Sequence, residues 1–416
     1  MSNSSPKPQR DVRMRGFTHR TSVEVCRRWI DVHTAALEAE TVAVNEAAGR
    51  VLAEEILSDV DVPGFDRSAM DGYALRGEET VGAGDYSPLS FRLIGESLPG
   101  AAYAGSVGPG EAVRIMTGAP LPAGADAVLP AEFAEEVGGA VHATEAAPPG
   151  KNVGRRGEDI AAGSRILSKG RRLRPQDLGV LASIGRGHVE VVRPPRVRLV
   201  VTGDELLPAG SRPTGYRIAD SNSWMLEALI RRDGGVPLTA PIVPDQPEAL
   251  RAALVEGGVD VVLVSGGSSV GTEDHAPRLL AEVGELAIHG VAMRPSSPAG
   301  MGRIDGALVF LLPGNPVSCL CAYDFFAGRA IRRLGGRSGE FPHAMVRARL
   351  RRKIASAVGR VDYTRVRVVG EEVEPLAISG ASILSSTTRA DGFMIVPADS
   401  EGFPAGAEVT VLLYET

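Results

Sequence analysis

VDVVLVSGGSSVG, residues 259–271, is the part of the sequence that indicates the architecture most directly. Its apolar run, Val259–Ser265, has the length and β-branched composition of a buried strand, and a glycine–serine loop follows at once. Three further apolar runs, each followed by a predicted helix, are Val197–Thr202, Leu238–Val243 and Ala307–Leu312. Continuously apolar strands that alternate with helices are typical of a parallel sheet covered on both faces. We therefore predict a three-layer α/β domain.

The loops after three of these strands carry residues typical of a ligand site. Asp204 and Glu205 follow the first strand, and the loop Ser265–Gly271 follows the third. Asn315 and Pro316 follow the fourth, as the expected cap and first residue of a helix. Ligands of such sheets bind outside the carboxyl ends of the strands, and the N–H groups of glycine-rich loops favour oxyanions. The sequence thus predicts an anionic ligand at this edge.

A second group of candidate residues is acidic. The segment VPGFDRSAMDGYALR (62–76) holds Asp66 and Asp71 among turn-forming residues, where they either serve a metal or proton-transfer site or only accept hydrogen bonds from loop N–H groups. Further acidic residues lie in similar loops: Asp159, Glu205, Asp220 and Asp274. Because carboxylates repel an anion, we predict that Mg²⁺ bridges them to a phosphate. Asp220 equally fits a helix cap.

Two other interpretations of these motifs are less favoured. GSSVG (267–271) matches the nucleophile elbow of serine hydrolases, with Ser269 at its centre. In such an elbow the helix begins directly after the serine, whereas here the next helix is predicted near Pro277. The basic run Arg347–Lys353 suggests a nucleic-acid surface, but its alternation with apolar residues indicates the solvated face of a strand.

Composition sets limits on the class of protein. The chain has 416 residues, a net charge of −6, 50 Gly and 29 Pro, which predicts several soluble domains with many turns and no nucleic-acid partner. Three cysteines form no CxxC pair, which favours the cytoplasm. No run of 18 apolar residues occurs, so no membrane span is expected. Residues 1–18 are predicted to be a disordered tail.

Seven motifs, in order along nearly the whole chain, resemble one family. They are VPGFDRSAMDGYALR (62–76), RIMTGAPLPAGADAVL (114–129), RRGEDI (155–160), TGDEL (202–206), IADSN (218–222), SGGSSVGTEDH (265–275) and LPGNPVS (312–318). The family is that of the molybdopterin molybdenumtransferases, which includes bacterial MoeA and the E domain of gephyrin.

The resemblance implies an elongated homodimer with four domains in each subunit. After the tail, residues 19–52 and 155–193 are expected to form a discontinuous linking domain around an inserted β-domain, residues 53–154. Residues 194–335 are expected to be the α/β molybdopterin-binding domain, and residues 336–416 a C-terminal β-barrel. In the family, the β-domain of one subunit faces the α/β domain of the other.

The resemblance also implies the reaction and its residues. Adenylylated molybdopterin and molybdate are the substrates, and the phosphoanhydride is hydrolysed with Mg²⁺ present as molybdenum is ligated and AMP released. The implied catalytic residues are Asp66, Thr117, Asp159, Glu205 and Asp274, of which Glu205 and Asp274 are the metal ligands. The implied substrate-binding residues are Asp220, Ser265, Gly266, Gly267, Ser269, Gly271, Arg294, Ser297, Pro313, Gly314, Asn315 and Pro316. The adenylyltransferase that supplies molybdopterin and molybdoenzyme chaperones are the implied protein partners.

One segment departs from the family pattern. Where a lysine-rich K-P-G-K-P-like stretch is usual, this chain has Arg294-Pro295-Ser296-Ser297-Pro298. Arg294 keeps one positive charge, and Ser297 replaces the second with a neutral hydroxyl. Two hypotheses follow: an enzyme that inserts molybdenum, or a non-catalytic paralogue that carries molybdopterin or acts as a scaffold.

Overall fold

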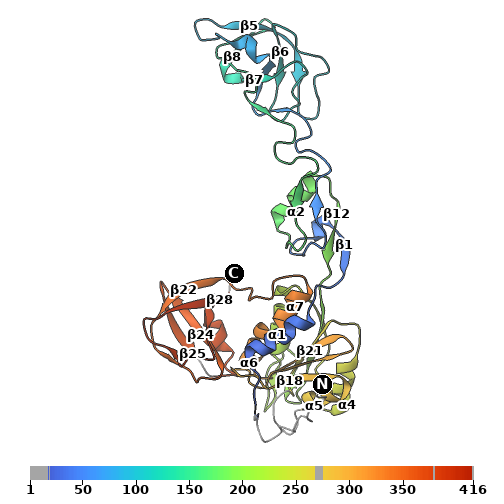
Figure 1. The fold of residues 1–416 in the computed structure, drawn as a ribbon, viewed down its shortest axis with the longest axis vertical. Helices are drawn as coiled ribbons and strands as arrows, with labels where there is room; N and C mark the ends of the chain where they lie inside the picture. The colour runs from blue at the N-terminus through green and yellow to red at the C-terminus, as the bar shows by residue number, and fades with distance from the viewer. Residues whose placement is uncertain (1–16, 18, 268–274, 378–379, 415–416) are drawn as a thin grey trace, which may run out of the picture. The chain divides into compact units, whose positions relative to one another are not determined.

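The computed structural model describes residues 17, 19–267, 275–377 and 380–414, and it forms two compact units (Figure 1). The first unit comprises residues 1–40, 49–51 and 191–416, and the second comprises residues 41–48 and 52–190. Of the predicted disordered tail, residues 1–16 and 18 lie outside the described residues. The division into four domains stays a prediction.

A six-stranded sheet forms the centre of the first unit, in the order β16-β13-β17-β21-β20-β18. Its strands are β13 (Arg196–Val201), β16 (Val236–Thr239), β17 (Val261–Ser265), β18 (Glu285–His289), β20 (Gly300–Ile304) and β21 (Ala307–Leu312). The first four in this order run parallel, as predicted. β20 and β18 are antiparallel, so the prediction of a wholly parallel sheet is wrong at this edge. The turn Asp305-Gly306, with φ values of 45° and 90°, joins β20 to β21 as a tight hairpin.

β16 is displaced from its predicted position. The strand was expected at Leu238–Val243 and lies at Val236–Thr239. β16 is the edge strand of the sheet, which tolerates Pro237, and its pairing with β13 ends at Thr239. The chain returns to β13 only at Val243, whose N–H donates to the carbonyl oxygen of Val201 at 2.8 Å.

Helices cover both faces of the sheet. On one face lie α3 (Asn222–Arg232) and a continuous helical run of α6 (Pro316–Ala322), η4 (Tyr323–Ala327) and α7 (Gly328–Leu334). On the other lie α4 (Pro247–Val255) and α5 (Ala276–Val283). Successive strand residues serve opposite cores, since Leu199 and Leu263 pack with the first set of helices and Val200 and Val264 with the second. The predicted three-layer architecture is confirmed.

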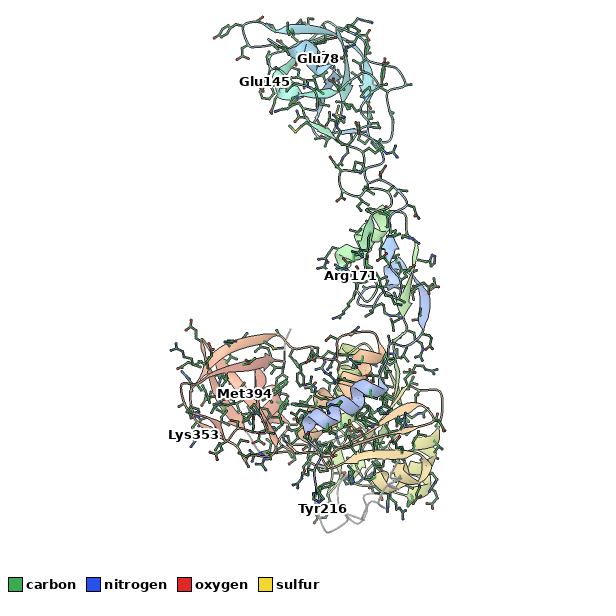
Figure 2. The ribbon with its side chains drawn as sticks, viewed as in Figure 1. Glu78, Glu145, Arg171, Tyr216, Lys353 and Met394 are labelled. Carbon is green, nitrogen blue, oxygen red and sulfur yellow. The ribbon has the colours of Figure 1, made fainter. Side chains whose placement is uncertain are left out.

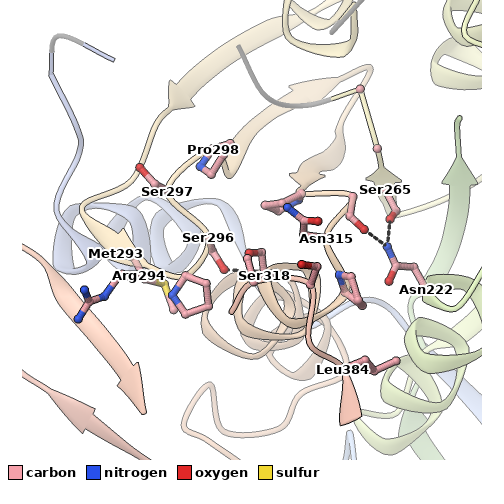
Figure 3. Close-up of a pocket in the computed structure, with 18 of the residues that line it drawn as sticks. Asn222, Ser265, Met293, Arg294, Ser296, Ser297, Pro298, Asn315, Ser318 and Leu384 are labelled. Carbon is pink, nitrogen blue, oxygen red and sulfur yellow. Dashed lines mark hydrogen bonds between the residues drawn. The ribbon is translucent and has the colours of Figure 1, made fainter. Parts of the chain in front are cut away.

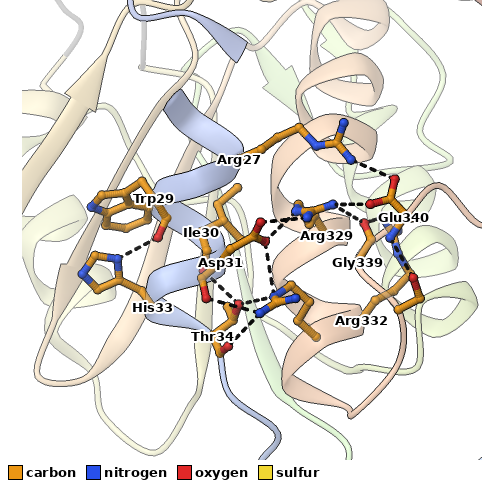
Figure 4. A network of polar contacts seen from close by, with 12 residues as sticks. Arg27, Trp29, Ile30, Asp31, His33, Thr34, Arg329, Arg332, Gly339 and Glu340 are labelled. Atoms are coloured by element: carbon orange, nitrogen blue, oxygen red, sulfur yellow. Dashed lines mark hydrogen bonds and ion pairs between the residues drawn. The ribbon is translucent and has the colours of Figure 1, made fainter. Parts of the chain in front are cut away.

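α1 (Val23–His33) packs against α7 within the first unit. Asp31 of α1 accepts hydrogen bonds from Nε and Nη2 of Arg329 at 2.7 and 2.8 Å (Figure 4). The resemblance assigns this helix to a linking domain, whereas its buried side chains join the core of the central sheet.

The start of α1 differs from its prediction. The spacing of Thr21 and Glu24 predicts a capping box, but the N-cap is Ser22, whose Oγ accepts a hydrogen bond from the N–H of Val25 at 3.3 Å. The main chain of Thr21 instead forms a bridge to Val291.

The C-terminal part of the first unit is a closed barrel of β22 (Met345–Leu350), β24 (Val361–Val369), β25 (Glu372–Ala377), β26 (Gly392–Val396) and β28 (Glu408–Leu413). Pairing runs β24-β25-β22-β28-β26, and β26 closes the ring by pairing with β24. Met394 is 1% exposed inside the barrel, and Lys353 lies at its surface (Figure 2). Arg347 and Arg349 of the basic run lie on the exposed face of β22, as expected, and Arg351–Lys353 are exposed directly after the strand. Arg347 is paired with Glu408 at 3.0 Å.

Short elements complete the first unit. They are β14 (Leu206–Leu207) paired with β15 (Ile218–Ala219), β19 (Met293–Arg294) paired with β24, β23 (Ile354–Ala355) paired with β27 (Gly402–Phe403), and α8 (Ser385–Thr388).

The second unit contains another six-stranded sheet, in the order β7-β4-β6-β5-β9-β8, as the predicted β-rich region requires. Its strands are β4 (Gly72–Leu75), β5 (Leu89–Ser97), β6 (Glu111–Ile115), β7 (Ala127–Pro130), β8 (Ala134–Val137) and β9 (Ala140–Ala143). The smaller strands are β2 (Ile56–Leu57) paired with β11 (Arg165–Leu167), and β3 (Arg67–Ser68) paired with β10 (Val153–Gly154). Single helical turns are η2 (Gly77–Thr80) and η3 (Ala131–Phe133).

Two predictions near the linking segments are wrong and one is confirmed. The sequence predicts a short helix around Ala47–Leu52, but the described structure has only η1 (Val44–Glu46) before Gly49 takes a φ of 76°. The sequence also predicts a hairpin-like piece over Gly185–Pro195, which is instead a single strand, β12 (His188–Val192), that pairs with β1 (Ala39–Ala43). A helix is predicted from Pro175 onward, and α2 (Pro175–Ser183) begins there.

Two further findings concern membrane-spanning helices and the three cysteines. None of the helices in the described part of the chain is long and apolar enough to cross a membrane. Cys26, Cys319 and Cys321 are all buried as free thiols, and burial raises the pKa of Cys26 and of Cys319 to about 12.

Candidate functional site

A pocket of about 1390 Å³ lies in the first unit, where the carboxyl ends of β13, β17 and β21 meet. This is the edge at which parallel sheets bind ligands. Eleven residues expected at the site line it: Glu205, Asp220, Ser265, Gly266, Gly267, Arg294, Ser297, Pro313, Gly314, Asn315 and Pro316.

The floor of the pocket is built from two loops that touch. Gly266 has a φ of 99°, and a Cβ at this position would lie 2.3 Å from the carbonyl oxygen of Thr202, so only glycine fits. Nδ2 of Asn222 donates to Oγ of Ser265 at 2.9 Å and to the carbonyl oxygen of Gly314 at 2.8 Å (Figure 3). Asn222 thereby ties the loop after β17 to the loop after β21.

Three carboxylates line the pocket, and two of them are already engaged. Oδ1 of Asp220 accepts hydrogen bonds from the N–H groups of Asn222 and Ser223, at 2.8 and 3.1 Å, so it caps α3 as the sequence allowed. Asp245 accepts hydrogen bonds from the hydroxyl of Thr202 and the N–H of Asp204. Among the described residues, Glu205 is the pocket carboxylate whose side-chain oxygens accept no hydrogen bond, and it is exposed.

The start of α6 contributes less positive charge than its sequence suggests. Pro316 has no N–H group, and the next two N–H groups, of Val317 and Ser318, both point to the carbonyl oxygen of Ala381 at 2.9 and 3.4 Å. The N–H groups in the first turn of the helix are thus partly satisfied by a carbonyl oxygen of the same chain. The positive charge of the pocket comes instead from arginine side chains.

Three arginines line the pocket: Arg20, Arg294 and Arg360. Arg294 lies on β19 and donates to Oδ2 of Asp362 on the adjacent β24. Nε of Arg360 lies 3.2 Å from Oδ1 of the same carboxylate, which is fully buried. Figure 3 shows Arg294 and Ser297 on one side of the pocket and Ser265 and Asn222 on the other. The pocket therefore combines arginines with carboxylates.

Three expected site residues belong to the second unit. Asp66 accepts hydrogen bonds from Nη1 of Arg155 and the N–H of Arg156, both at 2.8 Å. The bond from the Arg156 N–H, followed by that from Arg155, lowers the pKa of Asp66. Arg155 and Arg156 are thus both paired with aspartates, Asp66 and Asp61.

Thr117 and Asp159 are the other two expected site residues of the second unit. The hydroxyl and N–H of Thr117 both donate to Oδ1 of Asp71 at 2.7 Å, which lowers the pKa of Asp71. Asp159 is exposed, and its N–H donates to the carbonyl oxygen of Val62 at 3.1 Å. Asp71 therefore accepts hydrogen bonds from a loop 46 residues away in sequence, in line with one of the two alternatives for it.

Three expected residues, Ser269, Gly271 and Asp274, lie outside the described residues. Other pocket residues were not anticipated: His19, Arg20, Asn222, Asp245, Ser318 and Arg360. Asp245 could have been found, because it follows a predicted strand in the same way as Asp204 does. Asn222 lies inside the IADSN motif. Arg20 and Arg360 carry no local signal.

Comparison with known families gives matches over most of the chain. A family model described as the MoeA N-terminal region (domain I and II) matches residues 21–185. A probable molybdopterin binding domain matches residues 198–333, and the MoeA C-terminal region (domain IV) matches residues 347–414.

Individual relatives, and a solved structure, are similar to this chain over most of its length. A putative molybdopterin biosynthesis protein of Methanocaldococcus jannaschii is 35% identical over 389 residues, which are 90% of this chain and 92% of that protein. A molybdopterin molybdenumtransferase of Haemophilus influenzae is 32% identical over 384 residues, 90% of this chain and 93% of that one. The crystal structure of a molybdopterin biosynthesis MoeA protein of Pyrococcus horikoshii matches with a TM-score of 0.83 at 34% identity, covering 96% of this chain and 100% of that chain.

Proposed function

This chain belongs to the MoeA family and is a transferase of molybdenum cofactor biosynthesis, and we propose that its large pocket is where molybdate is inserted into adenylylated molybdopterin. The observation that carries this proposal is that three arginines and three carboxylates line one pocket of about 1390 Å³. Arginines suit phosphate and molybdate oxygens, because a guanidinium donates two parallel hydrogen bonds. A pocket of this size also has room for a ligand that joins a pterin to a nucleotide.

The residues present fit Mg²⁺ as a bridging ion. Among the described residues, no group of three metal-ligating side chains is preformed. Mg²⁺ does not require one, since it is commonly held by one or two carboxylates together with substrate phosphates and waters. Glu205 has uncommitted oxygens for this role, and we propose Asp274 as the second ligand. When bound, Mg²⁺ would neutralise negative charge on the phosphoanhydride.

The chain's own residues then position the substrates. Arg294 and Arg360, held by the buried Asp362, present their positive charge to the phosphate and molybdate oxygens. Asn222 keeps the two glycine loops together, so the ligand meets a rigid floor. Water cleaves the phosphoanhydride and AMP leaves. The two dithiolene sulfurs then bind molybdenum, and their protons leave with one molybdate oxygen as water.

Further features of the proposal rest on the resemblance and, for the cytoplasmic location, on the cysteine content. Asp66, Thr117 and Asp159 are proposed to take part in catalysis, and the chain is proposed to be a cytoplasmic homodimer. The adenylyltransferase that supplies the pterin and molybdoenzyme chaperones are the proposed protein partners.

A turnover assay tests the proposed function. The purified chain is incubated with adenylylated molybdopterin, molybdate and Mg²⁺, and AMP release is measured together with molybdenum bound to the pterin. We expect both products in equal amounts, and we expect chelation of Mg²⁺ to stop AMP release. Asp274→Asn should lower turnover by about 10²-fold while the ligand still binds. Tight binding of the pterin without AMP release would favour the non-catalytic carrier instead.

A further inference from the structure

The segment that precedes α1 forms part of the pocket wall. Its main chain is joined to the segment before β19, because the Thr21 N–H donates to the Gly290 carbonyl oxygen at 2.9 Å and the Ala292 N–H donates to the Thr21 carbonyl oxygen at 2.8 Å. The ring of Phe17 packs edge-on against His289, with ring centroids 4.9 Å apart. These contacts lie on either side of His19 and Arg20, both of which line the pocket.

Arg20 lies directly against Ser297. Its Nε donates to Oγ of Ser297 at 2.7 Å, across 277 residues of sequence. At position 297 this chain has the neutral hydroxyl of a serine, where the family pattern usually has a second lysine. The guanidinium of Arg20 therefore brings a positive charge to the place where residue 297 itself has none.

The charge of Arg20 is less neutralised than that of the other two pocket arginines. Arg294 and Arg360 share the buried carboxylate of Asp362. Arg20 forms no ion pair with any acidic residue in the described part of the chain, and its partner Ser297 is uncharged. Because an ion pair offsets part of a cation's attraction for a ligand, Arg20 is the pocket arginine best able to attract an added anion.

We propose that Arg20, presented by the segment before α1 and oriented by Ser297, binds a tetrahedral oxyanion of the substrates, either molybdate or a pterin-linked phosphate. This inference rests on the proposed function, since that function supplies both oxyanions. It assigns a binding role to a residue outside the seven sequence motifs. It also makes the N-terminal segment a part of the binding site.

Equilibrium dialysis of the full chain with molybdate alone, and separately with inorganic phosphate alone, tests the proposal. Arg20→Gln keeps a hydrogen-bond donor and removes the charge, and we expect it to weaken binding of one of the two ions by about tenfold to a hundredfold. The ion affected identifies the oxyanion that Arg20 binds. Arg20→Lys should lose less affinity. Arg28→Gln, which removes an equal charge from the exposed face of α1, is the matched control and should bind as the wild type does.

A double variant separates charge from structural support. Arg20→Gln combined with Ser297→Lys returns a cation to the same place, and it should recover most of the lost affinity. Unchanged binding of both ions by Arg20→Gln, no measurable binding by the wild type, or failure of Ser297→Lys to recover any affinity would each overturn the proposal. Weaker ion binding by Arg20→Gln in a chain that shows no turnover would leave this inference standing and reject the proposed function. Normal turnover with unaltered ion binding in Arg20→Gln would reject this inference and leave the proposed function standing.

Discussion

Among single residues, the pocket carboxylates differ in the hydrogen bonds that they already accept. This difference indicates their roles. Asp220 and Asp245 hold α3 and the loop after β13 in place. Glu205 lines the same pocket and accepts no hydrogen bond from the described residues through its side chain. The first two are therefore expected to affect mainly the shape of the pocket, and Glu205 its chemistry.

We predict that Glu205→Gln lowers turnover with little effect on substrate affinity. The change keeps the shape of the side chain and removes the charge that is proposed to hold Mg²⁺. The expected decrease in AMP release is on the order of 10²-fold, as for loss of an electrostatic contact in the transition state. Glu248→Gln on the exposed start of α4 is the charge-matched control. Equal rates for wild type and Glu205→Gln would remove this residue from the mechanism.

Gly266 is a second residue whose role follows from local geometry. We predict that Gly266→Ala destabilises the chain by more than about 1 kcal/mol, because the new Cβ would approach the Thr202 carbonyl oxygen at a backbone conformation that favours glycine. The free energy of unfolding, measured in denaturant, tests this. Gly257→Ala has open space at its Cβ and should be nearly neutral. A variant at Gly266 as stable as the wild type would contradict the close contact.

At the scale of elements, α2 of the second unit shows how a buried carboxylate organises a helix start. Asp177 is 4% exposed and accepts two hydrogen bonds from Arg171, at 3.0 and 2.8 Å, and one from the N–H of Arg174 at 2.9 Å. These bonds, with those from Arg171 as the largest cause, hold the pKa of Asp177 well below its ordinary value. The ionised form is thus the one that stabilises the fold.

The sign of the resulting pH dependence follows from this lowered pKa. The stabilisation is complete above the unfolded-state pKa of about 4, and it is lost as the pH falls through the lower folded-state pKa. We predict that Asp177→Asn costs about 2 kcal/mol at pH 7 and that this difference shrinks below about pH 4. Thermal unfolding in buffers from neutral to acidic pH measures it, with the exposed Asp85→Asn as control. A difference that grows in acid would refute the assignment.

At the scale of the whole molecule, the resemblance implies a homodimer. Multi-angle light scattering at micromolar concentration should then give about twice the mass of one 43.5 kDa chain. The proposed homodimer would be rejected if the measured mass were that of one chain. The same measurement on Arg20→Gln should give the wild-type mass, since Arg20 is proposed to act on the ligand.

Much of the first unit could be predicted because its signals are local. β21 has the predicted bounds, Ala307–Leu312, and the helix that follows it begins at Pro316, as predicted. An apolar run and a proline at the start of a helix affect the conformation of the residues next to them. A short stretch of sequence is therefore enough to recognise them. The antiparallel edge of the central sheet was missed, because its strands are short and rich in glycine and charged residues.

Local patterns were enough to predict the layered α/β architecture and the glycine loops at the strand ends, and seven motifs identified the family and, through it, the C-terminal barrel. The distribution of charges, in contrast, is visible only in the tertiary structure. That structure showed that Asp362 holds Arg294, that Ala381 takes the first N–H groups of α6, and that Arg20 lies on Ser297. The physical reason is that periodicity records which face of an element is buried, whereas a contact between distant residues depends on how those elements pack together.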